Sequence, residues 1–298
     1  MENIQEHKNI IIHIGLHKTG TTFIQEKLSN LNNKNYKFFG SSEKLTNFLL
    51  KYLNNPENIL KEKIIKIINE TLEENIIISE EGIFGHPSLG YYDVSDKFKH
   101  LESVFYKPKY VIFFRKPSML IYSIYNQALK TEMNLEFEKY INMKIEYPKT
   151  NKNKRLCDGI NYKLFDYNII FKDYLNLKNR VLFLEFEKFF KKDENEVKKF
   201  NSYLGIKLNF DFNDVKNKSK NELFLLEYYN NFIVFKFVRS VILNFLKYFF
   251  NFKKEKLATV AAKLIVCINL IFPKKYFEKV EKKNKKLLQE INLFYLDK

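Results

Sequence analysis

The stretch that decides the fold is IIIHIGLHKTGTT, residues 10–22, which joins a hydrophobic run to a turn rich in glycine and threonine. The β-branched run ends at Gly15, the turn follows, and residues 23–28 then have the character of a helix. A strand, a short loop and a helix in this order can bind an anion, because backbone N–H groups and the positive end of the helix dipole converge there. The sequence therefore predicts a phosphate-binding loop.

The lysine of this loop separates it from an ATP-binding loop. Gly15 and Gly20 have the spacing of the glycines in a nucleotide-binding P-loop. A Walker loop places its lysine directly after the second glycine, where this chain has Thr21, whereas the lysine here is Lys18. We expect the loop to bind phosphate, but not the triphosphate of ATP.

A second motif is YVIFFRKP, residues 110–117, followed by SMLIYSIY, residues 118–125. The apolar run predicts a buried strand, and Pro117 suits the first turn of a helix. Arg115 is then expected at the carboxyl end of a strand, where open α/β sheets bind ligands, with Ser123 two turns into the helix. A guanidinium and a hydroxyl suit a phosphate dianion. The alternative is an ion pair for Arg115 and no special role for Ser123.

A third motif, NIIISEEGIFGHP at residues 75–87, ends a β-branched run in two carboxylates. It predicts another strand end at the same edge of the sheet, now with a candidate general base. Glu81 is the first candidate and Glu80 the second, since adjacent side chains of an extended chain point to opposite sides. His86 is a third candidate. In the other interpretation, one glutamate caps the next helix and the other is solvated.

Together the three motifs resemble the sulfotransferases that use 3′-phosphoadenosine-5′-phosphosulfate (PAPS). HKTGTT, residues 17–22, looks like their 5′-phosphosulfate loop, and Arg115 and Ser123, eight positions apart, look like their 3′-phosphate site. Residues 79–81 look like the Ser-x-Glu element of bacterial and carbohydrate sulfotransferases, which places Glu81 as the base. The resemblance implies that Lys18 and Glu81 are catalytic. It also implies that PAPS is bound by His17, Lys18, Thr19, Gly20, Thr21, Thr22, Arg115 and Ser123.

The implied reaction moves a sulfuryl group from PAPS to a hydroxyl or amine, with Lys18 meeting the charge on the departing oxygen. The expected acceptor is a carbohydrate, such as a bacterial surface polysaccharide or glycolipid. One alternative is a P-loop kinase or phosphotransferase, which needs a strand ending in Asp for magnesium, where this chain has Arg115. The other is a non-catalytic relative that binds a nucleotide or glycan at a membrane.

The fold class follows from the motifs and the resemblance. We expect an α/β domain over residues 1–231, P-loop-like and three-layered, with a central parallel sheet between helices. Residues 180–187 predict a further strand, and residues 200–206 look like the helix of the sulfotransferase family that closes with Leu-Gly. A helical appendage is expected at the carboxyl-terminal end, with an apolar and basic hairpin insertion at 232–272 and a closing helix of the same domain at 273–298. The hairpin could pack on protein or contact a membrane peripherally.

The charge and the cysteine content of the chain limit which partners are expected. The 298 residues carry a formal charge of +16, and residues 232–298 hold 15 Lys or Arg against 5 Asp or Glu. No nucleic-acid motif accompanies this basic excess, so nucleic acid is not an expected partner. The two cysteines, Cys157 and Cys267, have no ligand-spaced neighbours, so we expect no metal and no disulfide framework. The polar amino terminus does not look like a signal peptide or a membrane anchor, which Golgi sulfotransferases need, so the resemblance implies a cytoplasmic bacterial enzyme. Residues 232–272 are the expected place of a peripheral contact with the inner membrane.

Overall fold

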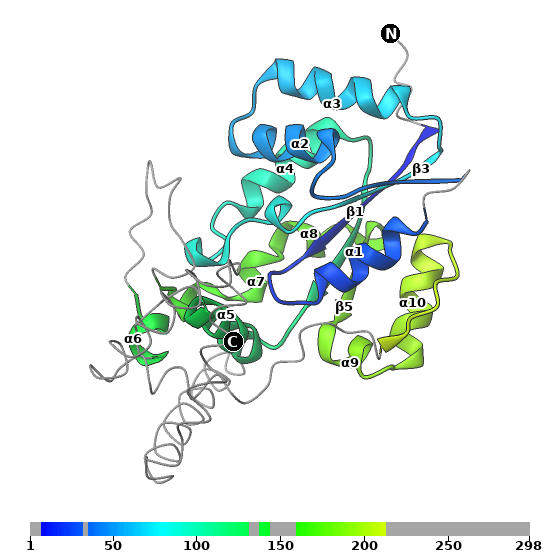
Figure 1. Cartoon of the computed structure of the whole chain (residues 1–298). Helices are drawn as coiled ribbons and strands as arrows, with labels where there is room; N and C mark the ends of the chain where they lie inside the picture. Colours follow the sequence, from blue (N-terminus) through cyan, green and yellow to red (C-terminus); the bar gives the residue numbers. More distant parts are fainter. Residues whose placement is uncertain (1–6, 32–34, 131–136, 144–158, 213–298) are drawn as a thin grey trace, which may run out of the picture. The chain divides into compact units, whose positions relative to one another are not determined.

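The computed structural model describes residues 7–31, 35–130, 137–143 and 159–212, and structural statements below concern these residues (Figure 1). The chain divides into two compact units. The first consists of Met1–His86, Tyr91–Lys116 and Asp166–Asn217, and the second of Pro87–Gly90, Pro117–Phe165 and Lys218–Lys298.

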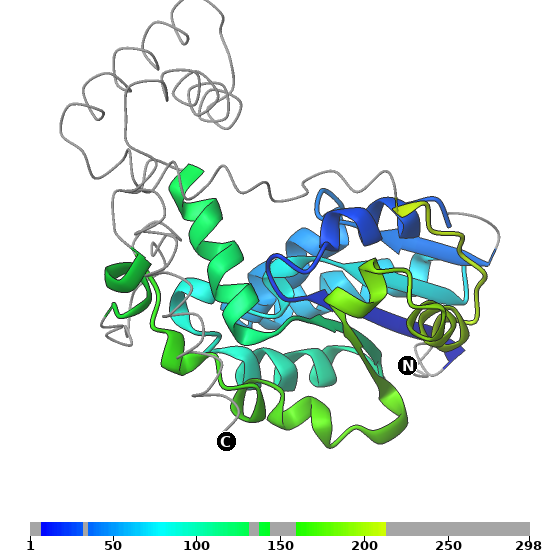
Figure 2. The ribbon, with the colours of Figure 1, turned by 90° about the horizontal axis from the view of Figure 1, so that it is seen from below.

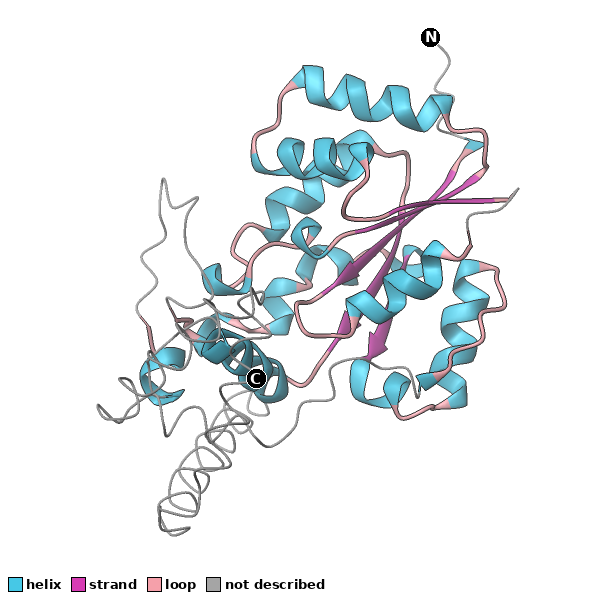
Figure 3. Cartoon of the chain, viewed as in Figure 1, coloured by secondary structure: helices cyan, strands magenta, loops and turns pink. Residues whose placement is uncertain are grey.

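A five-stranded parallel sheet forms the centre of the first unit (Figure 3). Its strands are β1 (Asn9–Gly15), β2 (Tyr36–Phe39), β3 (Asn75–Ser79), β4 (Lys109–Phe114) and β5 (Val181–Glu185), in the spatial order β2-β3-β1-β4-β5. β1 lies between β3 and β4, with Ile12 opposite both Ile78 and Tyr110. Because all pairs are parallel, the three sequence motifs reach the same edge of the sheet at the ends of β1, β3 and β4.

Alternating residues of the strands pack against helices on both faces, which explains their continuous hydrophobic character. One face is covered by α1 (Thr21–Ser29), α9 (Phe186–Phe190) and α10 (Glu194–Leu204). These helices share a buried cluster with the strand residues Ile11, Ile77, Val111, Phe113 and Leu184. The opposite side carries α2 (Lys44–Asn54), α3 (Asn58–Glu70), α4 (Val94–Val104), α7 (Tyr167–Ile170) and α8 (Lys172–Leu175), as Figures 1 and 2 show.

Aromatic side chains join this second layer to the sheet. Tyr174 of α8 packs edge-on against Tyr110 of β4 with ring centroids 5.1 Å apart, and Phe98 of α4 packs against Tyr174 at 4.9 Å. Such edge-to-face pairs stabilise a core beyond the area that they bury. The expected three-layer α/β fold with a central parallel sheet is confirmed.

Most predicted elements have the expected bounds, and the differences are local. Helix α10 ends at Gly205, whose φ of 69° is the left-handed conformation that glycine adopts most readily. The strand expected at 180–187 ends at Glu185, because Phe186 and Glu187 begin α9. The short strand β2 was not predicted. Three-residue 3₁₀ helices lie at Glu81–Ile83, Pro87–Leu89, Tyr162–Leu164 and Lys178–Arg180.

The described part of the second unit contains α5 (Pro117–Lys130) and α6 (Phe137–Ile141). Pro117 begins α5, as the sequence predicts. Phe137 of α6 lies 5.0 Å from the Tyr125 ring of α5, and Asn142 forms an antiparallel bridge with Asn161. The hairpin at 232–272, the closing helix at 273–298 and both cysteines lie outside the described residues. In the part of the chain described here, no helix has both the length and the apolar character needed to cross a membrane.

Candidate active site

The loop between β1 and α1 has the backbone of an anion-binding turn. Lys18 and Gly20 both have positive φ angles, 69° and 75°. Thr19 is fully buried and fixes the turn, since its Oγ1 donates to the Leu16 carbonyl at 2.6 Å and its N–H donates to the same oxygen at 3.2 Å. Helix α1 has no side-chain cap and no acidic residue in its first turn. The positive end of its dipole therefore faces no carboxylate from its own first turn and suits an anion.

Close packing requires both glycines of the loop. A Cβ at Gly15 would lie 1.8 Å from Cγ2 of Thr21, and a Cβ at Gly20 would lie 2.5 Å from Cζ of Phe190. Gly20 also has the left-handed backbone conformation that side chains disfavour. The spacing noted in the sequence is thus explained by the way in which the start of α1 and α9 pack against the turn.

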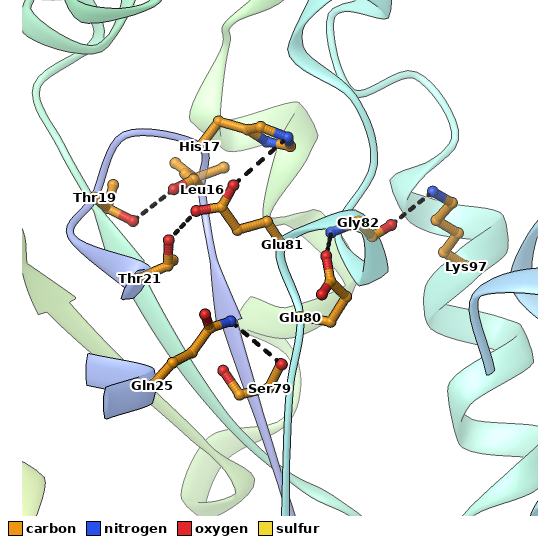
Figure 4. A network of polar contacts seen from close by, with 10 residues as sticks. All are labelled: Leu16, His17, Thr19, Thr21, Gln25, Ser79, Glu80, Glu81, Gly82 and Lys97. Atoms are coloured by element: carbon orange, nitrogen blue, oxygen red, sulfur yellow. Dashed lines mark hydrogen bonds and ion pairs between the residues drawn. The ribbon is translucent and has the colours of Figure 1, made fainter. Parts of the chain in front are cut away.

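The two glutamates after β3 point to different partners (Figure 4). Glu81 Oε1 accepts a hydrogen bond from the hydroxyl of Thr21, the first residue of α1. Glu80 instead accepts from the N–H of Gly82 at 3.2 Å and so caps the 3₁₀ turn. Burial raises the pKa of Glu81, the charge of Lys18 opposes this rise, and that of Glu80 adds to it. Glu81 thus contacts the loop through Thr21 and has the raised pKa of a candidate base.

Two imidazoles lie at the same place. Nε2 of His17 is 4.0 Å from Oε2 of Glu81, and the His17 and His86 rings are 5.5 Å apart in an edge-on arrangement. Burial lowers the pKa of His17 to about 3, helped by the charges of His86, Lys18 and Lys97. His17 is therefore neutral near pH 7, and its contact with Glu81 is not an ion pair. Burial also lowers the pKa of His86.

A buried ion pair holds the turn that carries Glu81. Lys97 of α4 is 6% exposed, and its Nζ lies 3.0 Å from both Asp93 Oδ2 and the Gly82 carbonyl. The sequence interpretation missed this pair, because a lysine and an aspartate four residues apart are typical of a solvated helix surface. Their position shortly after the Ser-x-Glu motif was the available signal.

Arg115 lies beside the loop, as the second motif predicts. Its Nη1 donates to the Lys18 carbonyl at 3.3 Å, and its guanidinium lies 4.6 Å from the centre of the Phe186 ring. Its Nε also donates to Oε1 of Glu187 at 2.6 Å, in an ion pair that is largely shielded from solvent. Arg115 thus forms both the ion pair of the alternative interpretation and the contact with the loop. Glu187 was not identified as a site residue, since it is 72 positions away in the sequence.

The structure gives less information on Thr22 and Ser123, the other predicted site residues. Thr22 is exposed in the first turn of α1. Ser123 is half-buried on α5 in the second unit, so its pairing with Arg115 stays a prediction. Within the described ranges, no group of three or more His, Cys, Asp or Glu side chains is arranged to hold a metal ion.

Three solved structures similar to this chain are sulfotransferases. One is from Alicyclobacillus acidocaldarius, with 16% identity and a TM-score of 0.46, covering 73% of this chain and 89% of the other. Mouse sulfotransferase SULT7A1 complexed with PAP has 14% identity and a TM-score of 0.36, covering 76% and 69%. The sulfotransferase domain from the curacin biosynthetic pathway has 12% identity and a TM-score of 0.37, covering 71% and 79%.

No protein-family model and no curated protein matches the chain. At these identities and TM-scores the likenesses do not establish an activity for this chain.

Proposed function

We propose that this protein is a sulfotransferase that moves a sulfuryl group from PAPS to a carbohydrate acceptor. The observation that supports this most is the meeting of three strand ends at one edge of the sheet. The end of β1 supplies an anion-binding loop, the end of β3 a carboxylate with a raised pKa, and the end of β4 a guanidinium bonded to the loop. An anion site beside a candidate base fits group transfer from a phosphorylated donor to a hydroxyl.

The residues present fit a doubly phosphorylated nucleotide. The start of α1 and Lys18 would hold the 5′-phosphosulfate, and Arg115 the 3′-phosphate. In the transfer, the bond between sulfur and the bridging oxygen of the donor breaks, and a bond forms between sulfur and the acceptor atom. The acceptor proton goes to Glu81, and adenosine 3′,5′-bisphosphate (PAP) leaves with its new charge next to Lys18.

The carbohydrate acceptor is proposed from the Ser-x-Glu resemblance of residues 79–81. A bacterial surface polysaccharide or glycolipid is the proposed class. A peripheral contact with a membrane through residues 232–272 would bring the enzyme to such a substrate, and it is proposed from the basic and apolar sequence of that segment.

Ligand binding tests the donor. A thermal-shift titration with PAP should raise the melting temperature in the absence of magnesium, whereas ATP with magnesium should raise it much less. The opposite order of responses would favour a P-loop kinase and contradict the proposal. Binding of PAP without turnover of PAPS on any acceptor would point to a non-catalytic relative.

The neighbouring glutamates provide a matched pair for the base. Glu81→Gln should lower turnover by about 10²- to 10⁴-fold, the usual contribution of a general base, with PAP binding retained. Glu80→Gln should keep most of the turnover, because that carboxylate only caps the 3₁₀ turn. The assignment is wrong if Glu80→Gln is the more damaging change in steady-state assays of PAP release.

A further inference from the structure

His17 and Glu81 approach each other without a direct hydrogen bond. The distance of 4.0 Å between Nε2 and Oε2 is too long for a hydrogen bond, which has a length of about 2.7–3.2 Å. An oxygen atom at about 2.8 Å from each of them would bridge the two, as water does in many polar contacts of this length. Glu81 uses its other oxygen to accept from Thr21, so Oε2 is the one directed at His17.

The position between His17 and Glu81 can be reached from solvent, and both side chains are held in place. The Glu81 side chain is 33% exposed and the His17 side chain 16%, so a ligand can approach from solvent. The His17 ring is held edge-on against His86 and lies 6.3 Å from the ring of the buried Tyr91. Thr21 holds Glu81 from the other side. Contacts on either side thus hold both polar groups in place.

The surroundings of the imidazole indicate which of its nitrogens carries the hydrogen. Nδ1 of His17 is buried and has no hydrogen-bond partner among the described residues, whereas Nε2 faces a carboxylate. A hydrogen on Nδ1 would be a buried donor without an acceptor, which is unfavourable, and a hydrogen on Nε2 is attracted to Glu81. The favoured form of His17 is thus a neutral donor at Nε2.

We propose that Nε2–H of His17 and Oε2 of Glu81 together bind the oxygen of the acceptor, and that this arrangement selects a hydroxyl over an amine. The inference rests on the proposed sulfuryl transfer and narrows its acceptor. A hydroxyl donates its hydrogen to Glu81, accepts from His17 with one lone pair, and attacks sulfur with the other. A neutral amine has a single lone pair, so a bond from His17 would occupy the pair that must attack.

In the resulting step, the acceptor O–H proton passes to Glu81 as the oxygen–sulfur bond forms. The bond between sulfur and the donor's bridging oxygen breaks, and the products are a sulfate ester and PAP. His17 keeps its own proton throughout and is a catalytic residue that contacts the acceptor. This role differs from the expectation that His17 binds the co-substrate.

Three variants distinguish a His17 that contacts the acceptor from a His17 that binds the co-substrate. The side-chain amide of Gln can place an N–H near Nε2, whereas that of Asn reaches only to Nδ1. With PAPS as donor and methyl 2-amino-2-deoxyglucoside as acceptor, His17→Asn should lower kcat by about 10²- to 10³-fold, the cost of losing one such donor. His17→Gln should recover most of this loss, and PAP affinity should stay within about twofold in both. The exposed His7→Asn serves as the control and should match the wild type.

The same acceptor carries hydroxyls and one amine, so the site of sulfation can be found by mass spectrometry and NMR. The expected product is a sulfate ester on oxygen. Sulfation of the amine, unchanged kcat in His17→Asn, or a parallel loss of PAP affinity would each overturn the inference while leaving sulfuryl transfer in place. Nitrogen NMR of the ¹⁵N-histidine-labelled PAP complex gives a readout independent of activity, and an Nδ1–H form of His17 would also overturn it. If the wild type releases no PAP from PAPS with this acceptor, with any other acceptor or with water, the proposed function and the inference fall together.

Discussion

At the scale of single residues, Lys18 combines a proposed catalytic charge with an unfavourable backbone. Its φ of 69° lies in the left-handed region, which costs a residue with a Cβ about 1–2 kcal/mol. Such conformations are found where the surrounding structure fixes them and function benefits. The charge of Lys18 lies close enough to Glu81 to oppose the rise of its pKa.

Two substitutions at Lys18 separate charge from strain. Both Lys18→Ala and Lys18→Gly should lower turnover by at least about 10²-fold, because the charge that meets the departing oxygen is gone. Lys18→Gly should nevertheless be more stable than Lys18→Ala by about 1 kcal/mol, because glycine adopts the positive φ without strain. Urea unfolding and PAP-release assays measure the two effects. Equal stability of the variants would show that residue 18 is not strained, and retained turnover would refute its catalytic role.

At the scale of elements, one polar pair joins the central strand to its neighbour inside the core. His13 of β1 is 1% exposed, and its Nδ1 lies 2.6 Å from the hydroxyl of Ser79 in β3. The two residues face each other in the parallel register. The pair therefore satisfies one nitrogen of an imidazole that is shielded from solvent.

Ser79→Ala should destabilise the protein by about 1–3 kcal/mol, because it leaves a buried imidazole nitrogen without its partner. The free energy of unfolding in urea measures the cost. Since Glu81 is held separately by Thr21, PAP-release activity per folded molecule should change by less than about threefold. A free energy of unfolding equal to that of the wild type would mean that the His13–Ser79 pair makes no net contribution to stability.

The elements that sequence reasoning found are those with a strong local pattern. The β-branched runs that became β1 and β3, and the aromatic run that became β4, each end in a turn or charge. The short strand β2 was missed because its four residues resemble any aromatic stretch in a chain with 30 Phe and 19 Tyr. The end of β5 was placed too late because Phe186 suits either a strand or the helix that it begins.

For the candidate site, the sequence predicts which strand ends come together, but not the contacts between their side chains. Strand ends place Lys18, Glu81 and Arg115 together, because parallel strands bring their carboxyl ends to one edge. Contacts between side chains far apart in sequence carry no such pattern. The pair of Arg115 with Glu187, the clamp of Lys97 on Gly82 and the approach of His17 to Glu81 therefore became visible only in the fold.

At the scale of the whole molecule, the buried histidines link stability to pH. Burial lowers the pKa of both His13 and His17 from 6.5 to about 3. Below pH 6.5 the unfolded chain takes up protons that the folded protein refuses, so the stability that these residues contribute above pH 6.5 is lost as the pH falls toward 3. Glu81 acts in the opposite direction, because its raised pKa favours the folded state at acidic pH.

The slope of the unfolding free energy against pH, compared between variants, shows how much of the pH dependence comes from His13. The free energy of unfolding should fall by about 1.4 kcal/mol per pH unit for each histidine that titrates only when unfolded. Between pH 6 and pH 4 the His13→Asn variant should show a slope shallower than the wild type by about that amount, and the exposed His7→Asn should keep the wild-type slope. Parallel curves for His13→Asn and the wild type would contradict a neutral His13 in the folded state.

The grip of Lys97 on the Gly82 carbonyl has a consequence for biosynthesis. Asp93 and Lys97 come after the turn that they hold, so a nascent chain that has emerged only as far as residue 90 has Glu81 and its partner Thr21 but lacks the lysine that binds the Gly82 carbonyl. Strand β4, which pairs directly with β1, is synthesised later still. The turn that carries Glu81 is therefore held in its final place only after α4 has been synthesised, and its position beside the loop at the end of β1 is complete only once β4 has followed.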